Sequence, residues 1–423
     1  YGLQYRLGAL PYSRSPQGLT GVVTIPAQLG VWSTVRLDLA QDVAALWPDM
    51  ADISWDHHFD SLAFGCTSRN GAAAGLYFAN AMIARADASG RLPLDRRAQL
   101  FTALQRYYPS LAVMNNVVEV SGSAKHGNII GGNVDLIDYS APGAPTGDAV
   151  GYAVTLAHAN GGIATVNHPF GVKQSGLSSL STQDSGRRSI AGKYLANKLY
   201  GGADGLEVGY HERGGASLET LLKLGDTLSR NGLFTTYLGV SDNHVGTIGS
   251  WSRDASYNTF RTGTWEATTD EAGFLAAIRA GRVYCGEILL YTGHIWIEVD
   301  GNPMGSISVG SSSSRVLTVS ATGLTSNSVV EVVTGPVDYS GSVDPGTAVV
   351  HTFAAPDLAS GQASVLIDTS ASCFVRINLY DRTLPGRDKT LQGRRYAFSN
   401  PIWLLRVSPP NGIPAARQAP DTA

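Results

Sequence analysis

The chain has 423 residues and a formal net charge of −3 at pH 7, from 34 acidic and 31 basic side chains. This balance argues against nucleic acid or an anionic membrane as a partner, and no run approaches the roughly 18 consecutive apolar residues that a membrane helix needs. Charged residues make up only 15 % of the chain, against roughly 25 % in an average soluble domain. The composition predicts a weakly charged globular protein with no membrane span, and it leaves a small-molecule substrate and self-association open.

Cysteine usage and the first residue bear on the compartment. The three cysteines, Cys66, Cys285 and Cys373, are an odd number without C-x-x-C spacing, so neither a disulfide framework nor a zinc ribbon is indicated. The chain begins at Tyr1 rather than at Met, which fits removal of a signal peptide, although trimming of a longer chain would look the same. We therefore expect a secreted or periplasmic bacterial protein.

Between about residues 94 and 290, helical and strand periodicities alternate, which is the pattern of βα units around a parallel sheet. Upstream of the clearest units, we expect strands over 51–55 and 111–120 with a helix over 95–108 between them. Three further helices end at glycine-containing cap signals, and each precedes a short apolar run. The helices cover 148–160, 217–230 and 270–279, and the strands that follow them cover 163–166, 233–240 and 283–285.

Beyond about residue 291 the helical period disappears and short β-branched runs separated by turn residues take over. This pattern predicts an antiparallel β-sandwich. The expected strands cover 294–299, 316–320, 329–333, 349–353, 364–367, 374–380 and 396–407. We therefore divide the chain into an α/β domain over 1–290, a β-sandwich domain over 291–407 and a Pro- and Ala-rich tail over 408–423, which is ordered only if something holds it.

Polar residues follow several of the predicted strands directly. His57 follows the strand over 51–55, His168 follows 163–166, and Asp242 and His244 follow 233–240. The carboxyl ends of the strands of a parallel α/β barrel face one shared mouth, so these side chains are expected to converge there. Glu119 interrupts the apolar run from Val117 to Val120, an expensive place for a carboxylate unless it is paired or binds a cation.

Imidazole and carboxylate groups without thiolate are the ligands of zinc, manganese or iron in hydrolytic sites. We expect one or more such ions, and for catalysis we single out Glu119, which can bridge two metals, together with His168 and Asp242. The expected metal ligands are His57, Glu119, His126, His168, Asp242 and His244.

Each of these residues also has a simpler interpretation. Pro169 favours an extended conformation at His168, so the histidine could be part of a structural turn, and Asp242 could cap a helix. For His158 and His211 we expect local hydrogen bonds rather than metal binding. His294 and His351 lie in the β half, where we expect surface or sheet positions. The order of the motifs along the chain favours the metal site over these alternatives.

That order resembles the PHP (polymerase and histidinol phosphatase) family, and most closely its carbaryl-hydrolase branch. The matching blocks are residues 51–58, Glu119 with 125–131, 162–169, 205–208, 239–244 and 280–284, and residues 397–402 resemble the C-terminal region of that branch. The resemblance implies a distorted seven-stranded (β/α) barrel with up to three divalent metals, followed by the β-sandwich. It also implies that Glu119 is the bridging carboxylate and that Glu207 occupies a recurrent acidic position behind the ligands.

The first motif departs from the family pattern. The family begins with a His-x-His strand end, whereas the best match here has Pro11 and Ser13 at those positions. Because neither side chain replaces an imidazole, we expect one or two ions rather than three.

The function expected from these features is a metal-dependent hydrolase, in which a metal-bound hydroxide attacks a phosphoester, carbamate, ester or amide. The alternative is a catalytically degenerate secreted protein with a binding or self-assembly role. Other residues favour simpler roles: Lys173, Arg187, Arg188 and Arg253 fit solvated loops better than an anion site, and the aromatics Trp296, Tyr339 and Trp403 fit a core better than a carbohydrate site.

Overall fold

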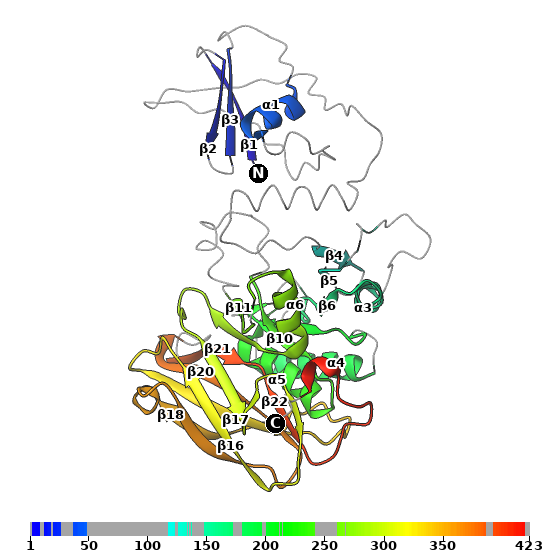
Figure 1. Ribbon diagram of the computed structural model, residues 1–423, viewed down its shortest axis with the longest axis vertical. Helices are drawn as coiled ribbons and strands as arrows, with labels where there is room; N and C mark the ends of the chain where they lie inside the picture. The colour runs from blue at the N-terminus through cyan, green and yellow to red at the C-terminus, as the bar shows by residue number, and fades with distance from the viewer. Residues whose placement is uncertain are drawn as a thin grey trace. The chain divides into compact units, whose positions relative to one another are not determined.

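The structure is a computed structural model that describes residues 2–8, 12–17, 20–26, 37–48, 117–122, 126–132, 134, 137, 148–171, 180–196, 200–210, 212–213, 215–241, 260–266, 268–385 and 392–418. It divides into two compact units, residues 1–115 and 116–423, which we describe separately (Figure 1). The strand expected over 51–55 and the helix expected over 95–108 lie outside the described residues.

The described residues of the N-terminal unit form a small sheet with one helix. Its strands are β1 (Gly2–Gly8), β2 (Ser13–Gln17) and β3 (Thr20–Pro26), and the central β3 is parallel to β1 and antiparallel to β2. Helix α1 (Leu39–Leu46) begins where the Asp38 side chain accepts a hydrogen bond from the Gln41 amide. Val23 of the sheet packs with Val43 and with Leu46 and Trp47 at the helix end. This sheet has no counterpart among the elements expected from the sequence.

Residues 116–241 contribute a five-stranded mixed sheet. Its order is β10-β7-β6-β5-β4, in which β6, β7 and β10 are parallel while β4 and β5 are antiparallel additions at one edge. The strands are β4 (Val117–Ser121), β5 (His126–Ile130), β6 (Ile163–Val166), β7 (Gly205–Gly209) and β10 (Thr236–Gly239). A two-residue hairpin, β8 (Glu212–Arg213) with β9 (Ala216–Ser217), follows β7.

The helices expected at 148–160, 217–230 and 270–279 are confirmed as α3 (Ala149–Ala159), α5 (Leu218–Arg230) and α6 (Glu271–Ala280). Each begins at a side chain that accepts a hydrogen bond from a backbone amide of the first turn, in turn Asp148, Ser217 and Asp270. A further helix, α4 (Leu180–Leu195), packs against α5 and contains Arg187 and Arg188, so the solvated loop expected at those two residues is wrong.

Beyond residue 290 the described residues are mostly strands, as expected, and they form two sheets together with β11 and β12 from before that position. One sheet has eight strands, with the path β11-β12-β21-β20-β17-β18 and with β15 and β22 beside it, and a second has the order β14-β13-β16-β19. Their bounds are β11 (Phe260–Thr264), β12 (Val283–Glu287), β13 (Ile295–Val299), β14 (Asn302–Pro303), β15 (Ile307–Val309), β16 (Ser314–Ala321), β17 (Ser328–Pro336), β18 (Ala348–Ala354), β19 (Ala363–Asp368), β20 (Cys373–Pro385), β21 (Gln392–Ser399) and β22 (Ile402–Leu405).

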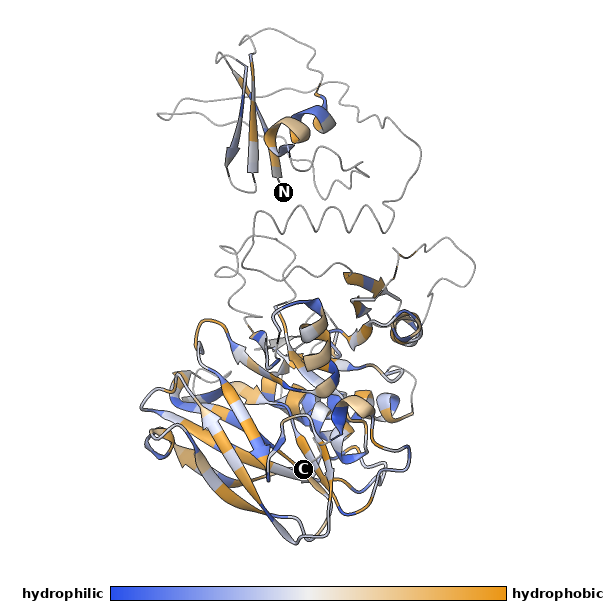
Figure 2. Ribbon diagram, in the orientation of Figure 1, coloured by the Kyte–Doolittle hydropathy of each residue, from blue (hydrophilic) through white to orange (hydrophobic). Residues whose placement is uncertain are grey.

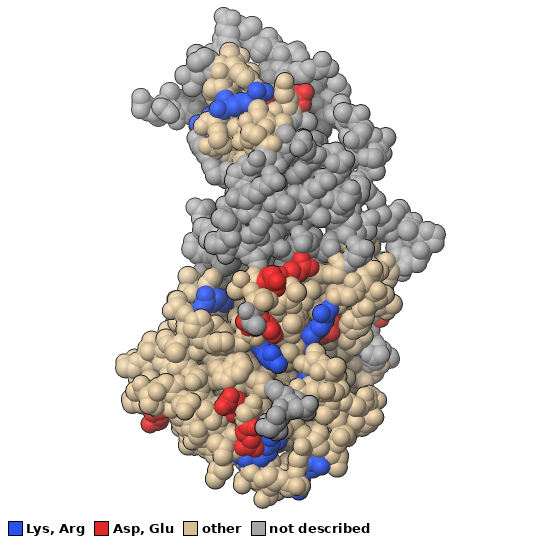
Figure 3. All heavy atoms as spheres, in the orientation of Figure 1, with Lys and Arg blue, Asp and Glu red and all other residues tan. Residues whose placement is uncertain are grey.

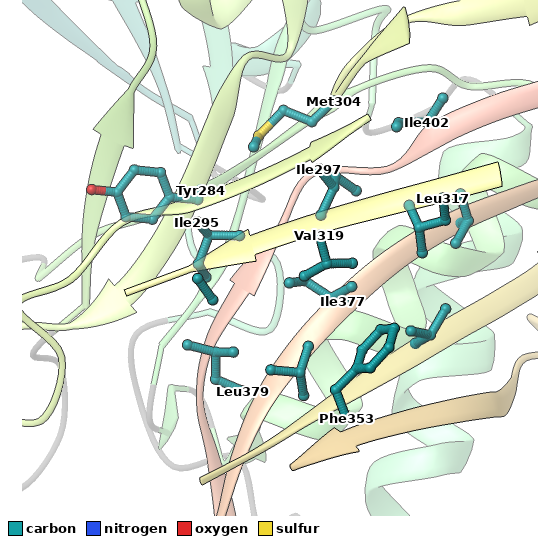
Figure 4. Packing of buried hydrophobic residues seen from close by; sticks show 14 of the residues in the cluster. Tyr284, Ile295, Ile297, Met304, Leu317, Val319, Phe353, Ile377, Leu379 and Ile402 are labelled. Atoms are coloured by element: carbon teal, nitrogen blue, oxygen red, sulfur yellow. The ribbon is translucent and has the colours of Figure 1, made fainter. Parts of the chain in front are cut away.

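The two sheets of this half share one hydrophobic core. Ile297 and Val319 of the four-stranded sheet pack with Ile377 and Leu379 of the eight-stranded sheet, all of them buried (Figure 4). Figure 2 shows apolar residues alternating with polar ones along these strands. Burial of this alternating apolar face is the driving force that holds the sheets together.

The eight-stranded sheet joins residues on both sides of position 290, because β12 pairs with β21. The described residues thus form a mixed α/β structure with more strands than helices, whose sheets do not close on themselves. The expected domain boundaries at 290 and 407 stay predictions. Part of the expected tail is held in place, since the buried Arg417 donates to Thr236 Oγ1 and to the Gly305 carbonyl.

The surface agrees with the low charge of the sequence. On the face shown in Figure 3, basic and acidic side chains are interspersed among uncharged residues. None of the described helices is both long enough and apolar enough to cross a bilayer.

Candidate metal centre

Three of the six predicted metal ligands lie together at one end of the five-stranded sheet. Glu119 is in β4, His126 begins β5, and His168 follows β6 by two residues. Each offers one ligand atom, and these atoms all lie within 4.8 Å of one another. The structure thus places close together three residues, up to 49 positions apart in the sequence, that the sequence pattern predicted to converge.

Strand pairing explains why Glu119 and His126 meet. Ser121 pairs with His126 across the antiparallel β4–β5 ladder, and residues two apart on a strand share a face. Glu119 therefore lies diagonally across from His126 on the same face, within reach of a long side chain. His126 Nδ1 lies 2.7 Å from Glu119 Oε1, within ion-pair distance.

His168 reaches the same place from the other neighbour of β5. The Asn167 amide donates to the His126 carbonyl at 3.1 Å, so the chain stays beside β5 just past the end of β6. The His126 and His168 ring centroids are 4.9 Å apart, with the rings inclined at 72°. The three side chains thus come from consecutive strands of one sheet.

The backbone of His168 is in the left-handed region, with φ of +27°. The extended conformation that we expected before Pro169 is therefore wrong. The His168 amide donates to Glu207 Oε2 at 2.8 Å, and its carbonyl accepts from the Gly171 amide at 2.7 Å. These contacts close a turn that the local preference of a residue before proline does not favour.

Exposure decreases from Glu119 to His168. The side chain of Glu119 is 47 % exposed and that of His126 is 33 % exposed, whereas His168 is only 5 % exposed. The expectation that Glu119 sits in a buried run is wrong, because β4 alternates and Val117 on the same face is itself 47 % exposed. Glu119 therefore needs no cation to offset burial, and the argument for a metal rests on the convergence of the three ligands.

The donor set fits a divalent transition metal. Two imidazoles and one carboxylate are the ligand types of catalytic zinc, manganese and iron sites. Bonds of about 2.1 Å place two ligand atoms of one ion at most about 4.2 Å apart, so the separations here close around an ion with shifts of about half an ångström. The residues present therefore fit a metal ion.

The remaining predicted ligands, His57, Asp242 and His244, lie outside the described residues, as do His211, Lys173 and Arg253. His158 bonds to Asp204 at 2.9 Å, which confirms the local hydrogen bond expected for it. His294 bonds to the Tyr284 hydroxyl at 2.9 Å. His351 lies on β18 and packs against Phe353.

Tyr210 is the residue near this centre that the sequence analysis missed. It is fully buried, and its hydroxyl donates to the same oxygen of Glu207 that accepts the His168 amide. A signal was available, because Glu207 is a charged residue within the otherwise apolar and wholly buried strand β7. Such a carboxylate requires hydrogen-bond donors nearby.

Comparison with known proteins assigns this chain to no family. No family model matches this chain, and no curated protein matches it. The function is therefore argued from the site alone.

Proposed function

We propose that this chain is a metal-dependent hydrolase whose centre includes Glu119, His126 and His168. The observation that supports the proposal is the convergence of these ligands from three consecutive strands to within 4.8 Å. A bound zinc, manganese or iron ion would supply a water of lowered pKa and would polarise the scissile phosphoester, carbamate, ester or amide. One or two ions fit the altered first motif better than three.

The three side chains have different parts in this proposal. His126 Nδ1 lies 2.7 Å from Glu119 Oε1; if Glu119 accepts the Nδ1 proton, Nε2 of His126 is left to bind the cation. His168 is buried and supplies the inner ligand. Glu119 is half exposed, so its carboxylate can both hold His126 and accept a proton from a bound reactant at the open side.

We further propose that His57, Asp242 and His244 complete the centre within a closed PHP-type barrel of seven strands. Strand β10 is parallel to β7 and β6 and ends at Gly239, which supports the placement of Asp242 and His244 at the edge where His168 lies. The sequence motifs and the parallel order of these strands support membership of the PHP family. Export to the periplasm or the medium remains part of this proposal.

Metal analysis and kinetics test the proposal together. Protein purified without chelator should contain about one or two equivalents of transition metal, and it should hydrolyse members of a panel of phosphoesters, carbamates, esters and amides when manganese or zinc is added. Glu119→Gln and Asp242→Asn should each lower kcat/KM by about 100-fold or more. His351→Gln serves as the matched control, because His351 lies on β18 away from the cluster.

Turnover that is unchanged in both site variants would refute the proposed centre. A protein that binds no metal and turns over no substrate would point to the alternative role in binding or self-assembly. The observation that favours this alternative is the presence of Pro11 and Ser13 in the first motif. A large or filamentous species in size-exclusion chromatography and electron microscopy would then support it.

A further inference from the structure

His168 is the most buried of the three clustered ligands, and its backbone adopts a conformation that L-residues rarely take. At φ of +27° the side chain crowds its own backbone. A residue in this conformation persists only when surrounding contacts determine it.

Glu207 provides one of these contacts from the neighbouring parallel strand. Val166 of β6 pairs with Leu206 of β7, so Glu207 lies next in register to the end of β6. Its carboxylate is only 5 % exposed, and Oε2 accepts the His168 amide at 2.8 Å. Glu207 thus contacts the backbone of the ligand residue, on the side of the amide rather than through the imidazole.

Tyr210 holds this carboxylate in turn. Its side chain is fully buried and its hydroxyl donates to the same Oε2. The Tyr210 amide donates to the Val208 carbonyl at 3.0 Å, which turns the chain directly after β7 and directs the side chain back along the strand. One oxygen atom therefore joins the backbone of His168 to a rigid, buried tyrosine.

We propose that Glu207 and Tyr210 are positioning residues that fix the left-handed backbone of His168 and thereby hold its imidazole beside His126 and Glu119. The inference rests on the proposed function insofar as the held imidazole serves a metal ion. Neither residue is assigned a catalytic role. The contact explains a charged residue inside β7, since an apolar side chain there would leave the His168 amide without this acceptor.

Three substitutions distinguish the role of Glu207 as a hydrogen-bond acceptor from the role of its negative charge. In Glu207→Leu the acceptor is lost while the shape is nearly kept, and in Tyr210→Phe only the hydroxyl is lost. In Glu207→Gln the amide oxygen can still accept from both donors, so this variant should behave like the wild type if the acceptor is what matters. Glu287→Leu is the matched control, because Glu287 is also a buried carboxylate in a strand but pairs with Arg394.

The first measurement is the affinity for Zn²⁺ and Mn²⁺ alone, by titration calorimetry on the full chain. We expect Glu207→Leu to weaken metal binding by about 10- to 100-fold, the range found for groups that orient metal ligands, and Tyr210→Phe to weaken it less. Glu207→Gln should restore near wild-type affinity. Glu287→Leu should lower the melting temperature without changing metal affinity, which separates positioning from general destabilisation.

The second measurement uses metal-free protein, so that it does not depend on the proposed function. Diethyl pyrocarbonate labels accessible imidazoles, and mass spectrometry gives the rate at each histidine. His168 should react slowly in the wild type and in Glu207→Gln, and several-fold faster in Glu207→Leu, while the exposed His158 and His294 keep their rates.

These outcomes are distinguishable. If the wild type binds no metal, the proposed function fails, and the labelling rate of His168 still decides whether Glu207 holds it. If Glu207→Leu keeps both wild-type metal affinity and a slow His168, the positioning role is overturned. If Gln and Leu lose affinity equally, the charge of Glu207 acts rather than its acceptor oxygen, and the proposal is likewise overturned.

Discussion

At the scale of single residues, His168 both contributes its side chain to the candidate metal centre and adopts a left-handed backbone conformation. Left-handed backbone at a residue other than glycine costs about 1–3 kcal/mol and is found where a functional side chain must be aimed. The turn is closed by contacts to Glu207 and Gly171. We therefore expect the backbone of His168 to lower the free energy of unfolding by an amount of this order.

A pair of substitutions measures this cost. His168→Gly and His168→Ala both remove the imidazole, but glycine accepts φ of +27° without the steric penalty that alanine retains. We expect His168→Gly to be more stable than His168→Ala by about 1 kcal/mol, or a few degrees in melting temperature. Urea unfolding of both variants without metal tests this, and equal stabilities would show that no strain is stored at this residue.

At the scale of elements, the sequence predicted those whose signals are local. Asp148, Ser217 and Asp270 mark the helix starts through caps formed within three residues. Much of the support of helix α4 comes from residues distant in the sequence. Arg187, only 1 % exposed, donates to Thr227 Oγ1 and to the Val343 carbonyl, up to 156 positions away. Contacts of that range cannot be read from local periodicity.

The candidate site was predictable to a similar extent. Residue types led us to expect His126, and a strand end led us to expect His168, among the metal ligands, and the structure places both in one cluster with Glu119. The sequence could not show that β5 pairs antiparallel with β6 and that β4 then pairs antiparallel with β5 as the edge strand, with Glu119 on an exposed face. Nor could it show the turn at His168, because a contact from Glu207 overrides the local preference set by Pro169.

The loop from Asp338 to Gly346 is held against the end of α5 by charge, and this contact should depend on pH. Arg230 contacts the Asp338 carboxylate at 2.6 Å, and this hydrogen bond lowers the pKa of Asp338 to about 2. The folded pKa lies below the unfolded value of about 3.9, so the contact stabilises the fold above about pH 4 and its contribution is lost as the pH falls towards 2.

Asp338→Asn tests this dependence. Because Asp338 is 37 % exposed, solvent screening limits the contribution to about 1 kcal/mol or less. We expect the wild type to exceed the variant in free energy of unfolding at pH 6, and the difference to shrink between pH 4 and pH 2. Urea titrations across this range measure it, and a difference independent of pH would exclude the Arg230 contact as its source.

At the scale of the molecule, residues 116–423 form one compact unit although the sequence favoured a boundary at 290. Buried polar contacts cross that position. Asp226 of α5 pairs with Arg376 of β20 at 2.7 Å, and both are almost fully buried. The Asn400 side chain bonds to the Tyr237 amide at 2.7 Å and to the carbonyls of Tyr237 and Val283 at 3.0 and 2.8 Å.

Asn400 therefore offers a test of whether the α/β part and the β part unfold together. Asn400→Ala leaves the Tyr237 amide and two carbonyls without this partner in a buried place, which should cost about 2–4 kcal/mol. If the unit is cooperative, hydrogen exchange should accelerate by the same factor in β6 and β7 as in β13 and β16, because one global opening exposes them all. Ser360→Ala, a substitution at an exposed turn, is the control. Acceleration confined to one set of strands would instead support separate domains that meet near residue 290, since each would then open with its own free energy.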